Sequence, residues 1–125
     1  MTRLSDREFE DAVGRALDRI ADEFHAYLEN VLIVVEDEPT AEDLESLGLA
    51  EGEPLLGAYY GIPLGEKSFF DVTMEPDRIV IYKRPLEEMC ETVDVLVEEI
   101  EITVIHEIAH HFDIDEETLE QYGYH

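Results

Sequence analysis

The stretch IHEIAHHF, residues 105–112, lies in a segment with helical periodicity. Residues four apart on an α-helix lie one turn above each other, so His106 and His110 can direct both imidazoles at a single ion. Glu107 follows the first histidine and can reach a water molecule held in the open coordination position. It can take a proton from that water during attack on a carbonyl and pass it to the leaving amine. The pattern predicts a zinc ion bound by the two histidines, with Glu107 as the general base of a peptidase.

A third metal ligand is needed, because a catalytic zinc ion usually has three protein ligands and a water molecule. Only 15 residues follow His110 in this sequence, so we expect the third ligand among them. In the short-spacer arrangement, the third ligand follows the second histidine by six residues, which gives Glu116. Asp115 is the alternative if the turn shifts by one residue. The remaining candidates in this segment are Asp113, Glu117, Glu120 and His125.

The composition narrows the classes of partner and compartment. The chain has 33 acidic and 8 basic residues, and its formal net charge is -25. Such a charge repels phosphate backbones and anionic membrane surfaces, so we expect neither nucleic acid nor membrane as a partner. No stretch has the length of a membrane span, and the N-terminus lacks the apolar segment of a signal peptide. Cys90 is the single cysteine, which predicts a cytoplasmic protein without an intramolecular disulfide, with Cys90 in the core or on a helix surface.

The length of 125 residues predicts one domain, residues 1–125. A capping-box pair, Ser5 and Glu8, begins an amphipathic helix that we expect over residues 6–28. The longest predicted helix covers residues 86–112 and carries the two histidines. The other predicted elements are strands at 31–35, 55–60 and 78–82, a short helix from 39 that ends before 48, a loop at 62–68, extended chain at 69–72, and a final helix at 116–122.

The long predicted helix has an apolar stripe that we expect to face the core. The two histidines and Glu107 fall on a neighbouring face, which argues against ordinary core packing. We expect His111 on another side of the helix, and Tyr122 and Tyr124 as packing residues rather than groups that polarise a substrate. The strand at 78–82 is our candidate for an exposed edge to which an extended peptide could add. The stripe consists of Met89, Val93, Leu96, Val97, Ile100, Val104, Ile108 and Phe112.

These features together resemble the small bacterial zincin-like metallopeptidase family. The resemblance rests on residues 106–116, the acidic helix before them, the strand at 78–85 with its basic exit, and the block LLGAYYGIPL at 55–64. It implies an α+β fold, a compact zincin-like domain in which a small mixed sheet packs on a long active-site helix beside an N-terminal helix. It further implies one zinc ion held by His106, His110 and a carboxylate, and peptide or protein substrates.

The chain departs from the family pattern at two positions. Asp113 stands where the family usually has glycine, and Glu116 stands where it usually has aspartate. Aspartate tolerates the left-handed conformation that such a turn requires better than most residues do. Glutamate keeps the charge of the ligand and reaches one methylene further.

Two functions are compatible with the sequence, and the remaining possibility is a chance match in which His106 and His110 are ordinary helix-surface residues without a metal. The first is a zinc-dependent metallopeptidase that hydrolyses peptide bonds. The second is a non-catalytic zinc-binding or protein-interaction domain that retains the fold, which the small size and the lack of a separate substrate-binding lobe would favour. Glu107 discriminates between them, because hydrolysis requires this residue and metal binding does not.

Overall fold

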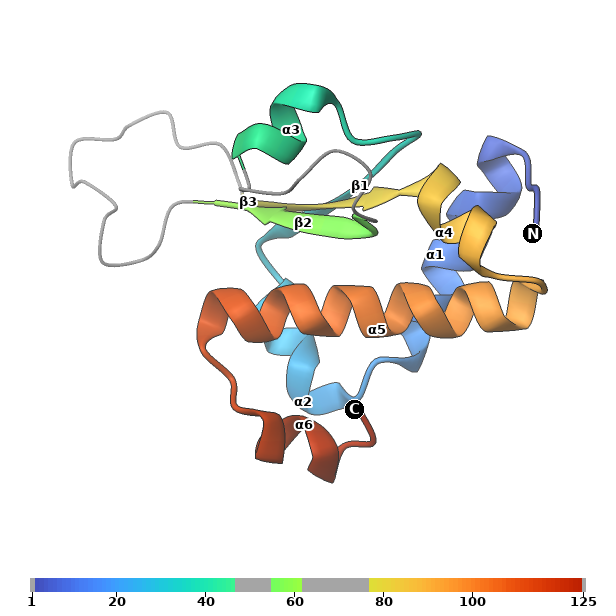
Figure 1. Cartoon of the computed structure of the whole chain (residues 1–125). Helices are drawn as coiled ribbons and strands as arrows, with labels where there is room; N and C mark the ends of the chain where they lie inside the picture. The colour runs from blue at the N-terminus through green and yellow to red at the C-terminus, as the bar shows by residue number, and fades with distance from the viewer. Residues whose placement is uncertain (1, 47–54, 62–76, 125) are drawn as a thin grey trace.

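The long helix α5 (Val93–Phe112) lies across one face of a small β-sheet in the computed structural model (Figure 1). The structure describes residues 2–46, 55–61 and 77–124. The predicted loop at 62–68 and extended segment at 69–72 therefore lie outside the described residues. Thr92 caps the N-terminus of α5, since its hydroxyl accepts a hydrogen bond from the Val95 N–H at 3.2 Å.

The described residues form a three-stranded mixed sheet. It consists of β1 (Val31–Glu36), β2 (Gly57–Tyr60) and β3 (Asp77–Tyr82), in the order β1-β3-β2. The β1 strand is parallel to β3, and β2 is antiparallel to it. β3 is thus the central strand and is paired on both sides. Our prediction that residues 78–82 form an exposed edge is therefore wrong.

The alternation of side chains along β3 places hydrophobic residues on both faces of the sheet. Ile79 and Ile81 belong to the main core, together with the buried residues of α5 and of helix α1 (Asp6–Arg19). Val80 and Tyr82 form a smaller cluster on the opposite face. Figure 1 shows helix α3 (Ala41–Ser46) over this second face. The sheet is consequently covered by helices on both sides, which suits a strand as apolar as β3.

The first predicted helix is interrupted at Ile20, which adopts an extended conformation with ψ 133°. It consists of α1, then α2 (Asp22–His25) and a 3₁₀ turn, η1 (Ala26–Leu28). The backbone groups freed at the interruption find side-chain partners. The Tyr124 hydroxyl accepts the Ala21 N–H at 3.2 Å, and the His25 ring bonds to the Ile20 carbonyl at 2.7 Å. The capping box of α1, predicted from Ser5 and Glu8, is confirmed.

The longest predicted helix is also divided. Helix α4 (Lys83–Met89) ends before Cys90, which is extended, and α5 begins only after Thr92. Met89 is 54% exposed and lies outside the core, contrary to our prediction. Pro85 lies in the first turn of α4, where the missing N–H has no intrahelical partner to lose.

Cys90 is buried, and burial raises the pKa of its thiol, as expected of a packed residue rather than a nucleophile.

The predicted fold class is confirmed, since the described residues form an α+β structure with a mixed sheet packed on α5 and α1. A last helix, α6 (Glu116–Gln121), follows α5 after a short turn. Among the described residues, no helix has both the length and the apolar character to cross a membrane.

Asp113 ends α5 in the left-handed conformation, with φ 55° and ψ 46°. Its N–H and that of Ile114 both bond to the Ala109 carbonyl, so this conformation closes the helix end. Glycine adopts it without a Cβ penalty.

We expect Asp113→Gly to raise the free energy of unfolding by about 0.5 kcal/mol and Asp113→Val to lower it by more than about 1 kcal/mol. Urea unfolding of the three proteins tests this order, and a Val variant as stable as the parent would contradict it.

Candidate metal centre

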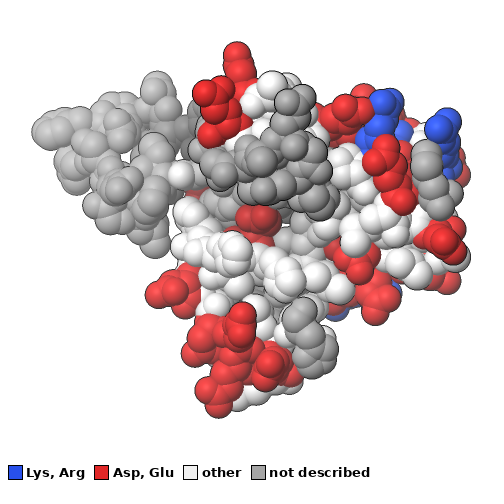
Figure 2. All heavy atoms as spheres, viewed as in Figure 1, with Lys and Arg blue, Asp and Glu red and all other residues white. Residues whose placement is uncertain are grey.

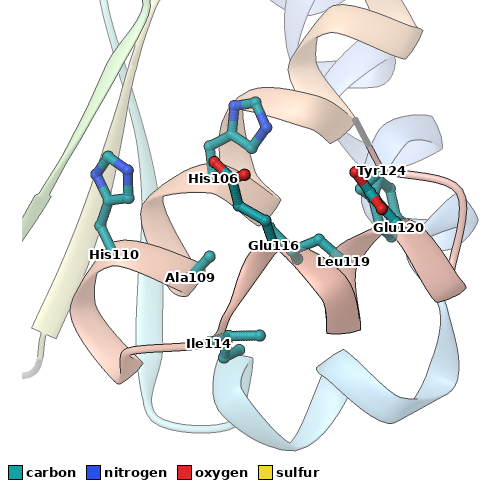
Figure 3. Close-up of a pocket in the computed structure, with 8 residues that line it drawn as sticks. All are labelled: His106, Ala109, His110, Ile114, Glu116, Leu119, Glu120 and Tyr124. Carbon is teal, nitrogen blue, oxygen red and sulfur yellow. The ribbon is translucent and has the colours of Figure 1, made fainter.

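The two motif histidines lie at a pocket between α5 and α6 (Figure 3). The pocket has a volume of about 300 Å³. In the figure, the Glu116 side chain extends from α6 towards the part of α5 that carries His106. His110 lies on the side of the labelled group that is away from Glu120 and Tyr124. The predicted ligands therefore share one pocket. Its lining residues are His106, Ala109, His110, Ile114, Glu116, Leu119, Glu120 and Tyr124.

The donor chemistry of this pocket suits zinc, because two imidazoles and one carboxylate are a common set of protein ligands for a catalytic zinc ion. The spacing of His106 and His110 on α5 suits it as well. Within residues 2–46, 55–61 and 77–124, however, no three His, Cys, Asp or Glu side chains are gathered closely enough to hold a metal ion. The ligand set therefore stays a prediction, made of residues that line a common pocket but do not form a coordination group.

Asp115, the alternative third ligand, has a structural role. Its side chain accepts the Thr118 N–H at 2.8 Å and caps the N-terminus of α6. This hydrogen bond lowers the pKa of the Asp115 carboxyl below its ordinary value. Glu116 lines the pocket, whereas Asp115 does not. This arrangement favours Glu116 as the ligand.

The other candidates for the third ligand are less well placed. Asp113 forms the left-handed end of α5, and neither it nor Glu117 lines the pocket. Glu120 does line the pocket. His125 lies outside the described residues. Glu116 and Glu120 are thus the two carboxylates that α6 contributes to the pocket.

Glu107 does not line this pocket and instead faces β2. Its carboxylate accepts a hydrogen bond from the Tyr59 N–H, and the side chain is half-buried. Burial raises the pKa of the Glu107 carboxyl above its ordinary value, while His110 and the Tyr59 N–H act in the opposite direction. A carboxylate that is held in place and made more basic by burial is suited to accept a proton.

A stack of side chains joins the end of α5 to β2 beside Glu107. The His111 ring lies 3.9 Å from the Tyr59 ring, centroid to centroid, with 13° between the planes. The Tyr59 hydroxyl donates to Asp77 at 2.8 Å, and His111 Nε2 lies 3.9 Å from the same carboxylate oxygen. A Cβ at Gly61 would come within 2.5 Å of Asp77 Oδ1. These contacts position β2, which supplies the N–H that reaches Glu107.

Sequence reasoning missed the contributions of Tyr59 and Asp77 to this stack. Their only signal in the sequence is indirect. His111 lies four residues after Glu107 and so shares its face of the helix, which predicts a common neighbour but does not identify it. As expected, His111 lies away from the pocket of the two histidines, but it shares the side of the helix that carries Glu107, which we had placed with the histidines.

Tyr124 lines the pocket, but its hydroxyl is fully engaged. It donates to Glu101 Oε2 at 2.7 Å and accepts the Ala21 N–H at 3.2 Å. Arg19 Nε lies 3.0 Å from the other carboxylate oxygen of Glu101. Burial, followed by the Glu101 carboxylate, raises the pKa of Tyr124. The predicted packing role of Tyr124 is therefore confirmed, and Tyr122 packs its ring edge-on against Phe24 with 5.1 Å between centroids.

The fold and the site define a class of protein, a small α+β domain whose central helix carries a His-Glu-x-x-His motif. The family model for zincin-like metallopeptidases matches residues 28–124, and the chain belongs to this family. The match begins after α1 and includes the sheet, α5 and α6.

A solved structure supports the fold assignment. A conserved hypothetical protein from Thermus thermophilus is similar in structure, with a TM-score of 0.56 and 23% sequence identity. The similarity covers 87% of this chain and 94% of that protein. No curated protein matches the chain.

The contacts of Tyr124 yield a stability prediction. Tyr124→Phe removes one of the two polar partners of the buried Glu101 carboxylate and leaves the Ala21 N–H without its acceptor. We expect a loss of about 1–3 kcal/mol in the free energy of unfolding. Tyr122→Phe is the matched control, because Tyr122 is 39% exposed and should tolerate the loss of its hydroxyl. Equal stability of the two variants in urea unfolding would contradict this role of Tyr124.

Proposed function

We propose that this chain is a zinc-dependent metallopeptidase that hydrolyses peptide bonds in peptides or exposed protein segments. In this proposal His106, His110 and Glu116 bind one zinc ion, and Glu107 is the general base. The observation that carries it is the placement of the two histidines and Glu116 at one pocket, with Glu107 beside them on the face of α5 towards β2. Membership of the zincin-like metallopeptidase family supports the same reaction class.

Zinc, when bound, would supply Lewis acidity and make a water molecule nucleophilic at neutral pH. The protein would contribute the movement of a proton. Glu107 accepts a proton as the peptide carbonyl is attacked and then transfers it to the leaving nitrogen, which must depart as an amine. The Tyr59 N–H fixes the carboxylate, and partial burial increases its basicity.

The proposed ligands differ in how freely they can adjust. His110 and Glu116 are exposed, whereas His106 is partly buried. Exposed side chains change rotamer at little cost, so these two can turn towards an ion that His106 helps to fix. The helix cap at Asp115 holds the start of α6, from which Glu116 extends.

A second candidate function is a zinc-binding or protein-interaction domain without catalysis. One observation favours it, namely that Glu107 does not line the pocket that the proposed ligands share. A change at Glu107 distinguishes the two functions, because Glu107 is the proposed base and is not among the proposed ligands.

The first test concerns Glu107→Gln. This variant keeps a side chain that can accept the Tyr59 N–H, but it cannot act as a base. We expect about one zinc ion per chain, as in the parent protein, and a fall of at least about 100-fold in peptide hydrolysis. Glu117→Gln is the control with the same change of charge, because Glu117 is exposed and does not line the pocket. Undiminished hydrolysis by the Glu107→Gln variant would refute the assigned base.

The second test compares the ligands by elemental analysis of protein purified without chelators. His106→Ala and His110→Ala should lose zinc, and Glu116→Ala should bind it more weakly. Asp115→Ala should keep its zinc while losing about 1 kcal/mol of stability, since it removes the cap of α6. Full zinc content in the Glu116 variant, together with loss of zinc in the Asp115 variant, would show that Asp115 and not Glu116 is the third ligand.

A further inference from the structure

The pocket between α5 and α6 extends beyond the proposed metal ligands. His106, His110 and Glu116 account for only part of its lining. In Figure 3, Glu120 and Tyr124 lie at the end of the labelled group that is farthest from His110. A substrate whose reacting bond lies near the histidines would therefore have room to place a side chain towards Glu120.

The wall between these two ends is apolar. Ala109, Ile114 and Leu119 line it, and Ala109 and Leu119 are buried. The methylene stem of a long side chain can pack on such a wall while its polar end stays at the rim. A volume of about 300 Å³ gives room for a single long side chain.

Glu120 provides a polar group at the far end. Its carboxylate has no hydrogen bond and no ion pair among the residues that the structure describes. The neighbouring acids have other roles, because Glu101 is bonded to Tyr124 and Arg19, and Glu116 is the proposed ligand. In the described part of the chain, no lysine or arginine lines this pocket.

The surface around the pocket has the same sign of charge. Figure 2 shows acidic side chains over α6, whereas most of the lysine and arginine on this face lies at the opposite end, near α4 and the N-terminus. A cationic side chain is attracted to such a surface and an anionic one is repelled. The apolar wall and the carboxylate together match the side chain of lysine or arginine.

We propose that this pocket is a substrate subsite for a lysine or arginine side chain, and that Glu120 determines the preference by pairing with the cationic end. The proposal rests on the proposed peptidase function, since it assigns the substrate class of the same site. It differs from a general attraction to an acidic protein because it depends on one carboxylate in the pocket.

The test measures binding separately from hydrolysis. Fluorescein-labelled peptides of alanine and glycine carry one variable residue, which is lysine, the uncharged isostere norleucine, or glutamate. Their dissociation constants are measured by fluorescence anisotropy, with and without added zinc, for the parent protein, Glu120→Gln and Glu117→Gln. The two variants change the net charge equally, but only Glu120 lines the pocket.

We expect the parent protein to bind the lysine peptide up to about 5-fold more tightly than the norleucine peptide, because Glu120 is exposed and an exposed ion pair contributes at most about 1 kcal/mol. Glu120→Gln should reduce this ratio to about 2-fold or less, and Glu117→Gln should retain most of it. The ratio should also decrease as salt is added. An unchanged ratio in the Glu120→Gln variant, an equal loss in both variants, or no lysine preference in the parent would each overturn the proposal.

Hydrolysis of the same peptides, followed by chromatography, keeps the two proposals apart. Preferential binding that depends on Glu120 without any cleavage would support the subsite and contradict the peptidase. Cleavage that depends on Glu107 but proceeds equally for lysine and norleucine peptides, together with equal binding of the two, would support the peptidase and contradict the subsite.

Discussion

The buried carboxylate of Glu101 fixes the relative positions of three distant parts of the chain. It is 8% exposed on α5, where it accepts the Tyr124 hydroxyl and pairs with Arg19 at the end of α1. A buried carboxylate needs such partners, because an isolated charge in the interior is strongly unfavourable. The same Tyr124 hydroxyl holds the Ala21 N–H, where the chain leaves α1. The C-terminal segment is thereby drawn against α5, and this placement closes one side of the pocket between α5 and α6.

Local patterns predicted those parts of the fold that depend on neighbouring residues. The capping box at Ser5, the β-branched run of β1 and the helical spacing of the two histidines each involve interactions within a few residues. The two helix interruptions were missed for the opposite reason. At Ile20 the apolar periodicity continues, and the hydroxyl that stabilises the break comes from Tyr124, 103 residues away from Ala21. At Thr92 a capping residue was present, but the apolar pattern across it favoured a single helix.

The candidate site likewise has some features that local patterns predict and others that depend on distant residues. The relation between His106 and His110 follows from helix geometry, and the position of Glu116 could be proposed from its spacing. The environment of Glu107 could not be predicted, because β2 supplies it across the space between sheet and helix. The order of the strands was equally inaccessible, since it depends on which of several apolar runs takes the central position. Residues 78–82 were assigned to an edge for this reason, although their almost continuous burial is typical of a central strand.

The hydrogen bond between Glu107 and the Tyr59 N–H also affects the behaviour of the sheet towards other chains. Among the described residues, β2 is paired on one side only, and an edge strand offers its unpaired N–H groups as a template for foreign strands. The Tyr59 N–H is already bound by a side chain of α5, so this position is closed to non-specific strand addition. A carboxylate proposed for catalysis thus also engages one main-chain donor of a sheet edge.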